Sequence, residues 1–491
     1  MVDINLVDLP TEVLVKIVHH VECEFGWKNK TLHYRQQVAA TCRALRAIAT
    51  PILYSVFEYD HDCESDILSD HKRPLLFARS LAHDRKLLLH LRTLSLVRWD
   101  SLFLHIDANQ NLFSGTSDSM NNLNRLGQLL LPPESKLKNL DIDYPMGCSF
   151  LKISLPKLKR VEIRPIGGAG FGGGMRRVGY PLSGYLNVDF LPYLLQSPKL
   201  EYMDLSSVHI IEDDMIRQAS IAPKSSSLKH LRMYVGNFDD AALLRLLEAP
   251  EGLISFDFHP TTECELASGS GSDPASLPRI STIGKALRAQ AGSLQRVSLS
   301  RGNWFWHPNL DNLGSLENLS NLKELKLNAT MLVGWEHCHH HRTEDKVVSG
   351  STWGLAKLLP NNLERLELVL DDHHWHRNGS SYVLSLVQGL EAAQQRLWKL
   401  KHVKIGLGFM PYCGKCDEHI GMDERRTNIS FKEIEAVRKV VKNCRFEFTW
   451  QPKYLFWDEE DGKAAHEPMP GVDEWATYED VESPEQMWGW N

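Results

Sequence analysis

The sequence predicts an α/β fold: a curved solenoid of parallel strands with helical crossovers, preceded by a small all-α unit. Three observations lead to this prediction. The chain has 491 residues, whereas a single compact core stops growing at roughly 250–300 residues, so a chain of this length needs several domains or a stacked array. A short apolar pattern recurs between residues 88 and 457. The N-terminal region instead shows helical periodicity.

The recurring pattern is Leu-x-x-Leu-x-Leu with conservative replacements, usually after Pro, Ser or Asn. It occupies Leu91/Leu94/Leu96, Leu137/Leu140/Ile142, Leu158/Val161/Ile163, Leu200/Met203/Leu205, Leu228/Leu231/Met233, Leu253/Phe256/Phe258, Leu294/Val297/Leu299, Leu322/Leu325/Leu327, Leu363/Leu366/Leu368 and Leu400/Val403/Ile405. The alternation that closes each unit is typical of a short strand with one buried face. Phe446 and Phe448 suggest a last strand.

Segments with helical periodicity separate many of these strands. They are 188–195, 239–247, 280–290, 353–359, 382–397 and 431–441. Alternating strands and helices predict parallel strands joined by right-handed crossovers. The units begin roughly 21 to 46 residues apart, wider than a regular leucine-rich period, which predicts insertions. One unit cannot bury its apolar face alone, but a stack can, so residues 88–457 are expected to form a leucine-rich-repeat solenoid with inserted loops.

The rest of the chain divides into three segments. Residues 1–57 contain two amphipathic runs, 12–21 and 34–49, with apolar residues three and four apart. The second helix is expected to end before Pro51, which cannot continue it. Residues 58–87 are expected to form a helical linker. Residues 458–491 are rich in Asp, Glu and Pro, a composition that predicts a disordered acidic tail.

The N-terminal residues also resemble the F-box of fungal F-box proteins. The similarity lies in three strings that occur in order: Leu9-Pro10-x-Glu12-Val13-Leu14-x-x-Ile17, then Val38-Ala39-Ala40-Thr41-Cys42-Arg43-x-Leu45-Arg46, then Thr50-Pro51-x-Leu53-Tyr54. The chain departs from the compact F-box pattern in its middle, where residues 22–33 form a longer connection. Leu-Pro alone is a weak signal, but the three strings directly before leucine-rich repeats are more specific.

This resemblance implies a non-catalytic substrate receptor of a Skp–cullin–F-box ubiquitin ligase. The F-box would dock on a Skp-type adaptor, and thereby on a cullin scaffold, through Leu9, Pro10, Ile17, Val38, Cys42 and Leu45. An unknown target protein would bind strand residues that the repeat leaves exposed: Asp141, Glu162, Arg164, Asp204, Arg232, Tyr234, Asp257, His259, Ser298, Lys326, Glu367 and Lys404. The alternative is a leucine-rich-repeat protein-binding scaffold unconnected with ubiquitination.

Several segments that follow the later strands are rich in His, Cys and aromatic residues. Because successive strands of a solenoid end along one edge, we expect these loops to be neighbours. One interpretation is a partner-binding patch, since Trp, Tyr and His suit interface anchors; its candidates are Trp304, Trp306, Trp335, His337, His374, Trp375 and Tyr412. The other is a zinc site at Cys413, Cys416 and His419, a weaker hypothesis because a second Cys-x-x-Cys is missing.

Composition narrows the function further. A net charge of −7 disfavours nucleic-acid binding, which needs a basic surface. Neither a signal peptide nor a run of about 20 apolar residues is visible, so no membrane association is expected. The nine scattered cysteines fit reduced thiols in the cytoplasm, the nucleus or both. The glycine pattern at 168–173 is not followed by a helix, and no catalytic triad is recognisable, so neither enzymatic activity nor a cofactor is expected.

Overall fold

The computed structural model describes most of the repeat region and parts of the N-terminal unit. The described residues are 10, 13–14, 16, 40, 43–60, 72–97, 127–144, 151–165, 186–187, 190–210, 221–238, 240–260, 278–299, 312–333, 354–408, 431–451, 457–458 and 463–464. The glycine pattern at 168–173, the connection at 22–33 and most of the acidic tail lie outside these ranges.

One sheet of thirteen strands organises the chain, and every strand pair in it is parallel. Twelve strands follow chain order across the sheet, while β5 (Leu186–Asn187) pairs only with the end of β6. The twelve are β1 (Val56–Asp60), β2 (Thr93–Val97), β3 (Asn139–Tyr144), β4 (Arg160–Pro165), β6 (Tyr202–Ile210), β7 (His230–Phe238), β8 (Ser255–Pro260), β9 (Arg296–Leu299), β10 (Glu324–Asn328), β11 (Arg365–Asp371), β12 (His402–Gly408) and β13 (Glu447–Gln451). The predicted α/β class and parallel strand order are confirmed.

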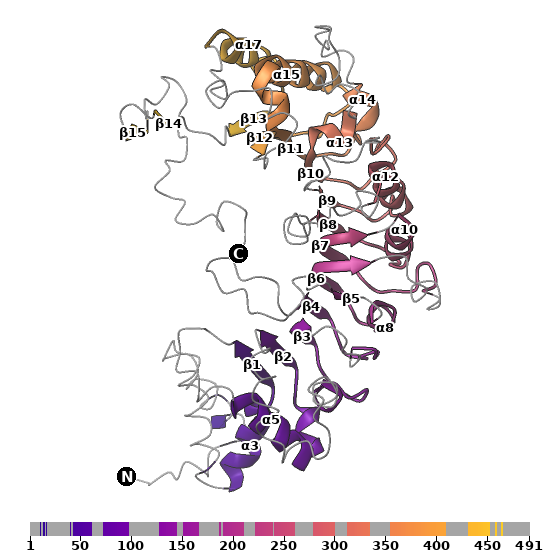
Figure 1. Cartoon of the computed structure of the whole chain (residues 1–491), viewed down its shortest axis with the longest axis vertical. Helices are drawn as coiled ribbons and strands as arrows, with labels where there is room; N and C mark the ends of the chain where they lie inside the picture. The colour runs from indigo at the N-terminus through magenta and orange to yellow at the C-terminus, as the bar shows by residue number, and fades with distance from the viewer. Residues whose placement is uncertain are drawn as a thin grey trace, which may run out of the picture.

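Helices lie on one side of this sheet, which traces an open arc with the strands on its inner side (Figure 1). They are α3 (Arg43–Leu53), α5 (Lys72–His83), the 3₁₀ helix η2 (Arg85–Leu89), α8 (Leu191–Leu195), α10 (Asp240–Glu248), α12 (Ile280–Ala289), α13 (Ala329–Val333), α14 (Leu355–Leu358), α15 (Asp372–Ala393) and α17 (Phe431–Val441). Two further short strands, β14 (Trp457–Asp458) and β15 (Lys463–Ala464), pair antiparallel with each other. Among the described helices, none is long and apolar enough to cross a bilayer.

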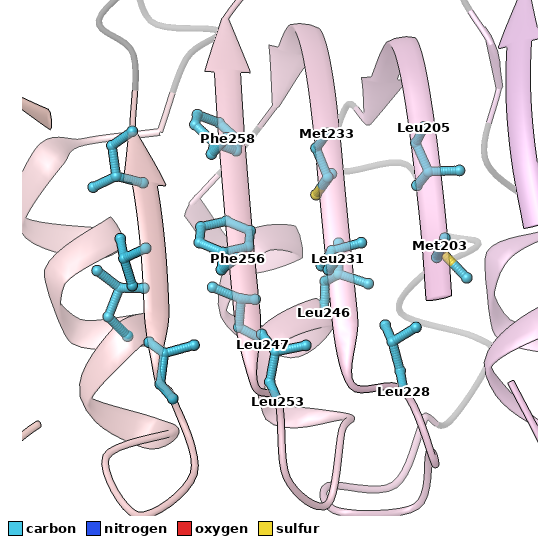
Figure 2. Close-up of a cluster of buried hydrophobic side chains, with 14 of the residues drawn as sticks. Met203, Leu205, Leu228, Leu231, Met233, Leu246, Leu247, Leu253, Phe256 and Phe258 are labelled. Atoms are coloured by element: carbon cyan, nitrogen blue, oxygen red, sulfur yellow. The ribbon is translucent and has the colours of Figure 1, made fainter. Parts of the chain in front are cut away.

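The core lies between the sheet and the helices and consists of the repeated apolar positions. On β6, β7 and β8 it takes Met203 and Leu205, Leu231 and Met233, and Phe256 and Phe258, all buried. Figure 2 shows these side chains, from neighbouring strands, beside Leu246 and Leu247 of α10. Fully burying one side chain of this kind contributes about 1.5–3 kcal/mol. Because each side chain contacts the next repeat, the stack shares one continuous core.

Polar residues just before the first leucine of a unit link neighbouring repeats. The Nδ2 atom of Asn321 donates to the carbonyl of Gly292 at 2.5 Å, and Nδ2 of Asn362 donates to that of Ser320 at 2.5 Å. The hydroxyl of Ser227 donates to the carbonyl of Leu200 at 2.8 Å. These bonds give the Ser or Asn before three of the units a role: their side chains pair carbonyls that turn residues would otherwise leave open.

Three boundaries differ from those expected. The sheet begins at β1, before residue 88, because Val56–Asp60 pairs along its whole length with β2; the segment 58–87 therefore starts as a strand. Helix α3 continues past Pro51 to Leu53, because a proline in the last turn removes only one intrahelical bond. Helix α15 begins at Asp372, so the segment expected as a loop around His374 and Trp375 is helical. An acidic first residue favours such a start.

Candidate functional site

The face of the sheet opposite the helices, here called the inner face, presents aligned rows of side chains. The central row contains Thr449 of β13 and the eleven residues in register with it, each of which lies between two buried positions of its strand: Glu58, Ser95, Asp141, Glu162, Asp204, Arg232, Asp257, Ser298, Lys326, Glu367 and Lys404. The flanking row lies two residues earlier: Val56, Thr93, Asn139, Arg160, Tyr202, His230, Ser255, Arg296, Glu324, Arg365, His402 and Glu447. Nine of the twelve predicted target-facing residues belong to the central row.

Asp141, Glu162 and Asp204 follow one another in the central row on β3, β4 and β6, and each is paired with a cation. Arg164 forms an ion pair with Asp141, whose carboxylate also accepts a hydrogen bond from the hydroxyl of Ser95 at 2.9 Å. The Nε atom of Arg160 donates to Glu162 at 2.6 Å. Because these pairs join residues on or across adjacent strands, they fix side chains that would otherwise sample many rotamers. This part of the face is rigid and polar.

In the middle of the face, Tyr202, Asp204, Arg232, Tyr234 and His259 form a Tyr/Arg cluster. Arg232 lies 3.8 Å from the carboxylate of Asp204 and bonds the Tyr234 hydroxyl. The rings of Tyr234 and His259 stack with centroids 4.9 Å apart, and the guanidinium of Arg160 lies 4.2 Å above the ring of Tyr202. Tyr and Arg are enriched among interface residues that contribute most to affinity. The cluster therefore has the chemistry of a protein-binding surface.

Burial raises the pKa of Asp204 in this cluster and lowers that of His259. Desolvation raises the pKa of Asp204 to about 6, although Arg232 opposes that shift. Desolvation also lowers the pKa of His259 to about 4, helped by the nearby charges of Arg232 and Lys326. Both residues are therefore less charged near pH 5 than they would be in the unfolded chain.

The two shifts predict pH dependences of opposite sign. The unfolded chain takes up a proton at His259 below about pH 6.5, so the stability linked to this neutral imidazole is lost as pH falls toward about 4. His259→Phe should therefore gain stability relative to the wild type on acidification, by at most about 1.4 kcal/mol per pH unit. Asp204→Asn should instead gain stability relative to the wild type as pH rises from 3.8 to about 6. Urea unfolding between pH 4 and 7 measures both slopes; parallel curves for wild type and His259→Phe would contradict the assignment.

A hollow of about 460 Å³ opens on the inner face beside this cluster, over β8 to β13. The carboxylate of Glu367 bridges two lysines there: Lys326 at 3.1 Å and Lys404 at 3.6 Å. Arg365 lies 3.9 Å from Glu324. Asp257, Arg296 and Ser298 also line the hollow. A volume of this size accommodates a few side chains of another molecule.

The residues predicted for adaptor binding fall partly outside the described ranges. Leu9, Ile17, Val38 and Cys42 are not described. Pro10 is exposed, and its carbonyl accepts the backbone N–H groups of Val13 at 2.9 Å and Leu14 at 3.1 Å, so a helical turn follows it as predicted. Leu45, on α3, is buried in the isolated chain.

Most residues predicted for the aromatic patch, and all those predicted for the zinc site, lie outside the described ranges. Trp304, Trp306, Trp335, His337 and Tyr412 lie outside them, as do Cys413, Cys416 and His419. His374 and Trp375 lie in the first turns of α15, but their side chains are not described. Within the described part of the chain, no group of three His, Cys, Asp or Glu side chains is placed to hold a metal ion.

The structure adds two features that sequence reasoning missed: the hollow and the stacking of Tyr234 on His259. Both depend on strand register, which sets which exposed residues become neighbours. The fold and this face define the chain as an α/β solenoid with a charged, aromatic inner surface. No protein family has a model that matches the chain, and no curated protein matches it.

Proposed function

We propose that this chain is the substrate-recognition subunit of a Skp–cullin–F-box ubiquitin ligase, built as an F-box followed by leucine-rich repeats. The observation that carries the proposal is the order of features along the chain. The strings Leu9-Pro10-x-Glu12, Cys42-Arg43-x-Leu45 and Pro51-x-Leu53-Tyr54 precede a solenoid of parallel strands without another domain between them. A receptor of this class needs a docking segment at one end and a wide binding surface in the remainder.

Exposed apolar side chains support a docking role for the N-terminal region. Of the six large apolar side chains exposed in the described part of the chain, four lie between residues 13 and 89: Val13, Val56, Leu76 and Leu89. Single exposed apolar side chains are ordinary on a protein surface, so it is their concentration in this region that agrees with a docking role. The rest of the solenoid exposes only Tyr193 and Trp398 among its described residues of this kind.

The inner face supports the role of target surface. It is long, polar and held by cross-strand ion pairs, and its Tyr/Arg cluster supplies anchors for a protein partner. Holding a target beside a ubiquitin-charged enzyme needs no catalytic group on the receptor itself. Apart from Val56, which lies in the flanking row of the inner face, the exposed apolar side chains of the N-terminal region are assigned to adaptor docking and the inner face to target binding in this proposal.

Capture of a purified Skp-type adaptor by the full-length chain tests the proposal. We expect the wild type to retain the adaptor and the double variant Leu9→Ala/Pro10→Ala to bind at least about tenfold more weakly, because these residues would be central apolar anchors. Arg232→Gln, on the inner face, is the matched control and should retain the adaptor fully. A folded wild type that captures no adaptor would overturn the proposal and favour a repeat scaffold with other partners.

A further inference from the structure

Two charged residues on the inner face differ from the others in having no partner for their side chains within the described part of the chain. Asp257 on β8 and Arg296 on β9 both line the hollow. In the central and flanking rows, as far as the structure describes them, every other Asp, Glu, Lys and Arg side chain has a polar or charged partner. Among the described residues, the side chains of Asp257 and Arg296 take part in no hydrogen bond or ion pair, although their backbones pair within the sheet.

The reason is an interruption in the cross-strand ladder. Arg232, which neighbours Asp257 in the central row, is engaged by Asp204 and Tyr234. On the other side stands Ser298, which carries no charge, and beyond it Lys326 is engaged by Glu367. The carboxylate oxygens of Asp257 therefore accept no hydrogen bond from any residue that the structure describes.

Burial disfavours the charged form of the Asp257 carboxylate. Desolvation raises the pKa of Asp257, even though the charges of Arg232, Arg296 and Lys326 all act to lower it. A partly desolvated carboxylate without donors is a group that a ligand can stabilise strongly, since hydrogen bonds to charged groups are stronger than neutral ones. Arg296 offers the complementary guanidinium one strand away.

We propose that Asp257 and Arg296 form a two-charge recognition site for a target segment that carries a basic and an acidic side chain side by side. The proposal rests on the assignment of the inner face as the target surface. The basic side chain donates to Asp257, the acidic side chain accepts from Arg296, and the hydroxyl of Ser298 lies in the same wall of the hollow. The segment enters the hollow next to the Tyr/Arg cluster.

The charges that line the hollow favour such a mixed ligand over one of a single sign. Its acidic residues are Asp257, Glu324 and Glu367, and its Lys and Arg residues are Arg296, Lys326, Arg365 and Lys404. The two signs nearly balance, and all but Asp257 and Arg296 are engaged with each other. A ligand with one charge would satisfy one of the two open groups and lie beside the other unpaired. Complementary charges also fix the register of the bound segment.

Blocked tetrapeptides can test the site in the full-length protein. The probes are acetylated and amidated Gly-Arg-Glu-Gly, its reverse Gly-Glu-Arg-Gly, and the single-charge peptides Gly-Gln-Glu-Gly and Gly-Arg-Gln-Gly, with dissociation constants measured by ligand-observed NMR. We expect the better of the two mixed peptides to bind about tenfold more tightly than either single-charge peptide. Equal binding of all four, or binding of none, would overturn the proposal.

Variants assign each charge to its partner. Asp257→Asn should lose the preference for Arg over Gln in the peptide and keep the preference for Glu over Gln, and Arg296→Gln should do the reverse. Asp257→Ser provides a second variant should the first not fold, and Glu447→Gln removes a charge from the same face outside the hollow and should change neither preference. An Asp257→Asn protein that still prefers Arg would refute the assignment. Adaptor capture is measured separately, so its failure leaves the peptide result standing and rejects only the ligase role.

Discussion

Gly284→Ala is expected to destabilise the solenoid by about 3 kcal/mol, near the upper end of what overpacking costs. Gly284 lies in α12, where a Cβ atom would stand 1.9 Å from the carbonyl oxygen of Leu313 and 2.7 Å from its carbonyl carbon. The carbonyl is not free to move, because it accepts a hydrogen bond from Nη1 of Arg288 at 2.8 Å and the N–H of Leu313 donates to Met331 at 2.9 Å. Helix propensity alone would favour Ala by about 1 kcal/mol, so the contact reverses the usual sign.

Gly292→Ala is the matched control, since a Cβ atom at that position meets no atom within 4 Å. Thermal unfolding followed by circular dichroism should show a clearly lower midpoint for Gly284→Ala and an almost unchanged one for Gly292→Ala. Hydrogen exchange should localise the loss to α12 and the segment that contains Leu313. Equal midpoints for Gly284→Ala and the wild type would mean that the helix can shift away from Leu313, contrary to this expectation.

The sheet and its core could be predicted from the sequence because one rule repeats. Each strand places two apolar residues on the buried face, and burial penalises polar residues there. The predicted positions from Leu91 to Ile405 are buried, and α17 begins and ends where the periodicity placed it. Because the pattern repeats many times, it remains recognisable where one unit departs from it, as at Met203, which stands where most units have Leu.

The differences arise where one local signal competes with tertiary packing. Residues 56–60 lack the full leucine pattern, but Phe57 is buried and stacks on Phe77 of α5 with centroids 3.9 Å apart. That contact and pairing with β2 make this segment the first strand. The start of α15 was missed because His and Asp residues were interpreted as loop or site residues, although they are compatible with a helix.

The candidate site was predictable only in part. Which residues face away from the core follows from the period of two, so the twelve inner-face positions could be named from the sequence. Their partners could not, because the neighbour of Asp204 is Arg232, 28 positions later, and an insertion of any length would leave that pairing intact. Whether a charge is engaged or open depends on such pairings. Asp257 and Glu367 occupy the same central row, and the side chains on the strands beside each one decide whether its carboxylate is engaged.

Gln290→Leu is expected to be at least as damaging as the glycine substitution, by about 3–5 kcal/mol, because it leaves several buried groups without partners. Gln290 follows α12 and is buried. Its Nε2 atom donates to the carbonyls of Leu247 at 2.6 Å and Pro250 at 3.1 Å, and its Oε1 atom accepts the N–H of Leu253 at 3.2 Å. One amide thus links α12 to the end of α10 and to the start of β8. Leucine fills a similar volume but provides neither donor nor acceptor.

An exposed glutamine near the end of a helix in a later repeat separates this effect from the hydrophobicity of leucine. Gln395 follows α15 and is exposed, so Gln395→Leu should change the free energy of unfolding by less than about 0.5 kcal/mol. Urea unfolding of both variants gives the comparison, and hydrogen exchange of the Leu253 amide reports the link directly. Faster exchange at Leu253 in Gln290→Leu alone is the expected result. Similar unfolding curves for the two variants would show that apolar packing alone holds the repeats together and that the Gln290 amide contributes little stability. In that case Asn321 and Asn362, which make the same kind of link in exposed positions, would also be dispensable.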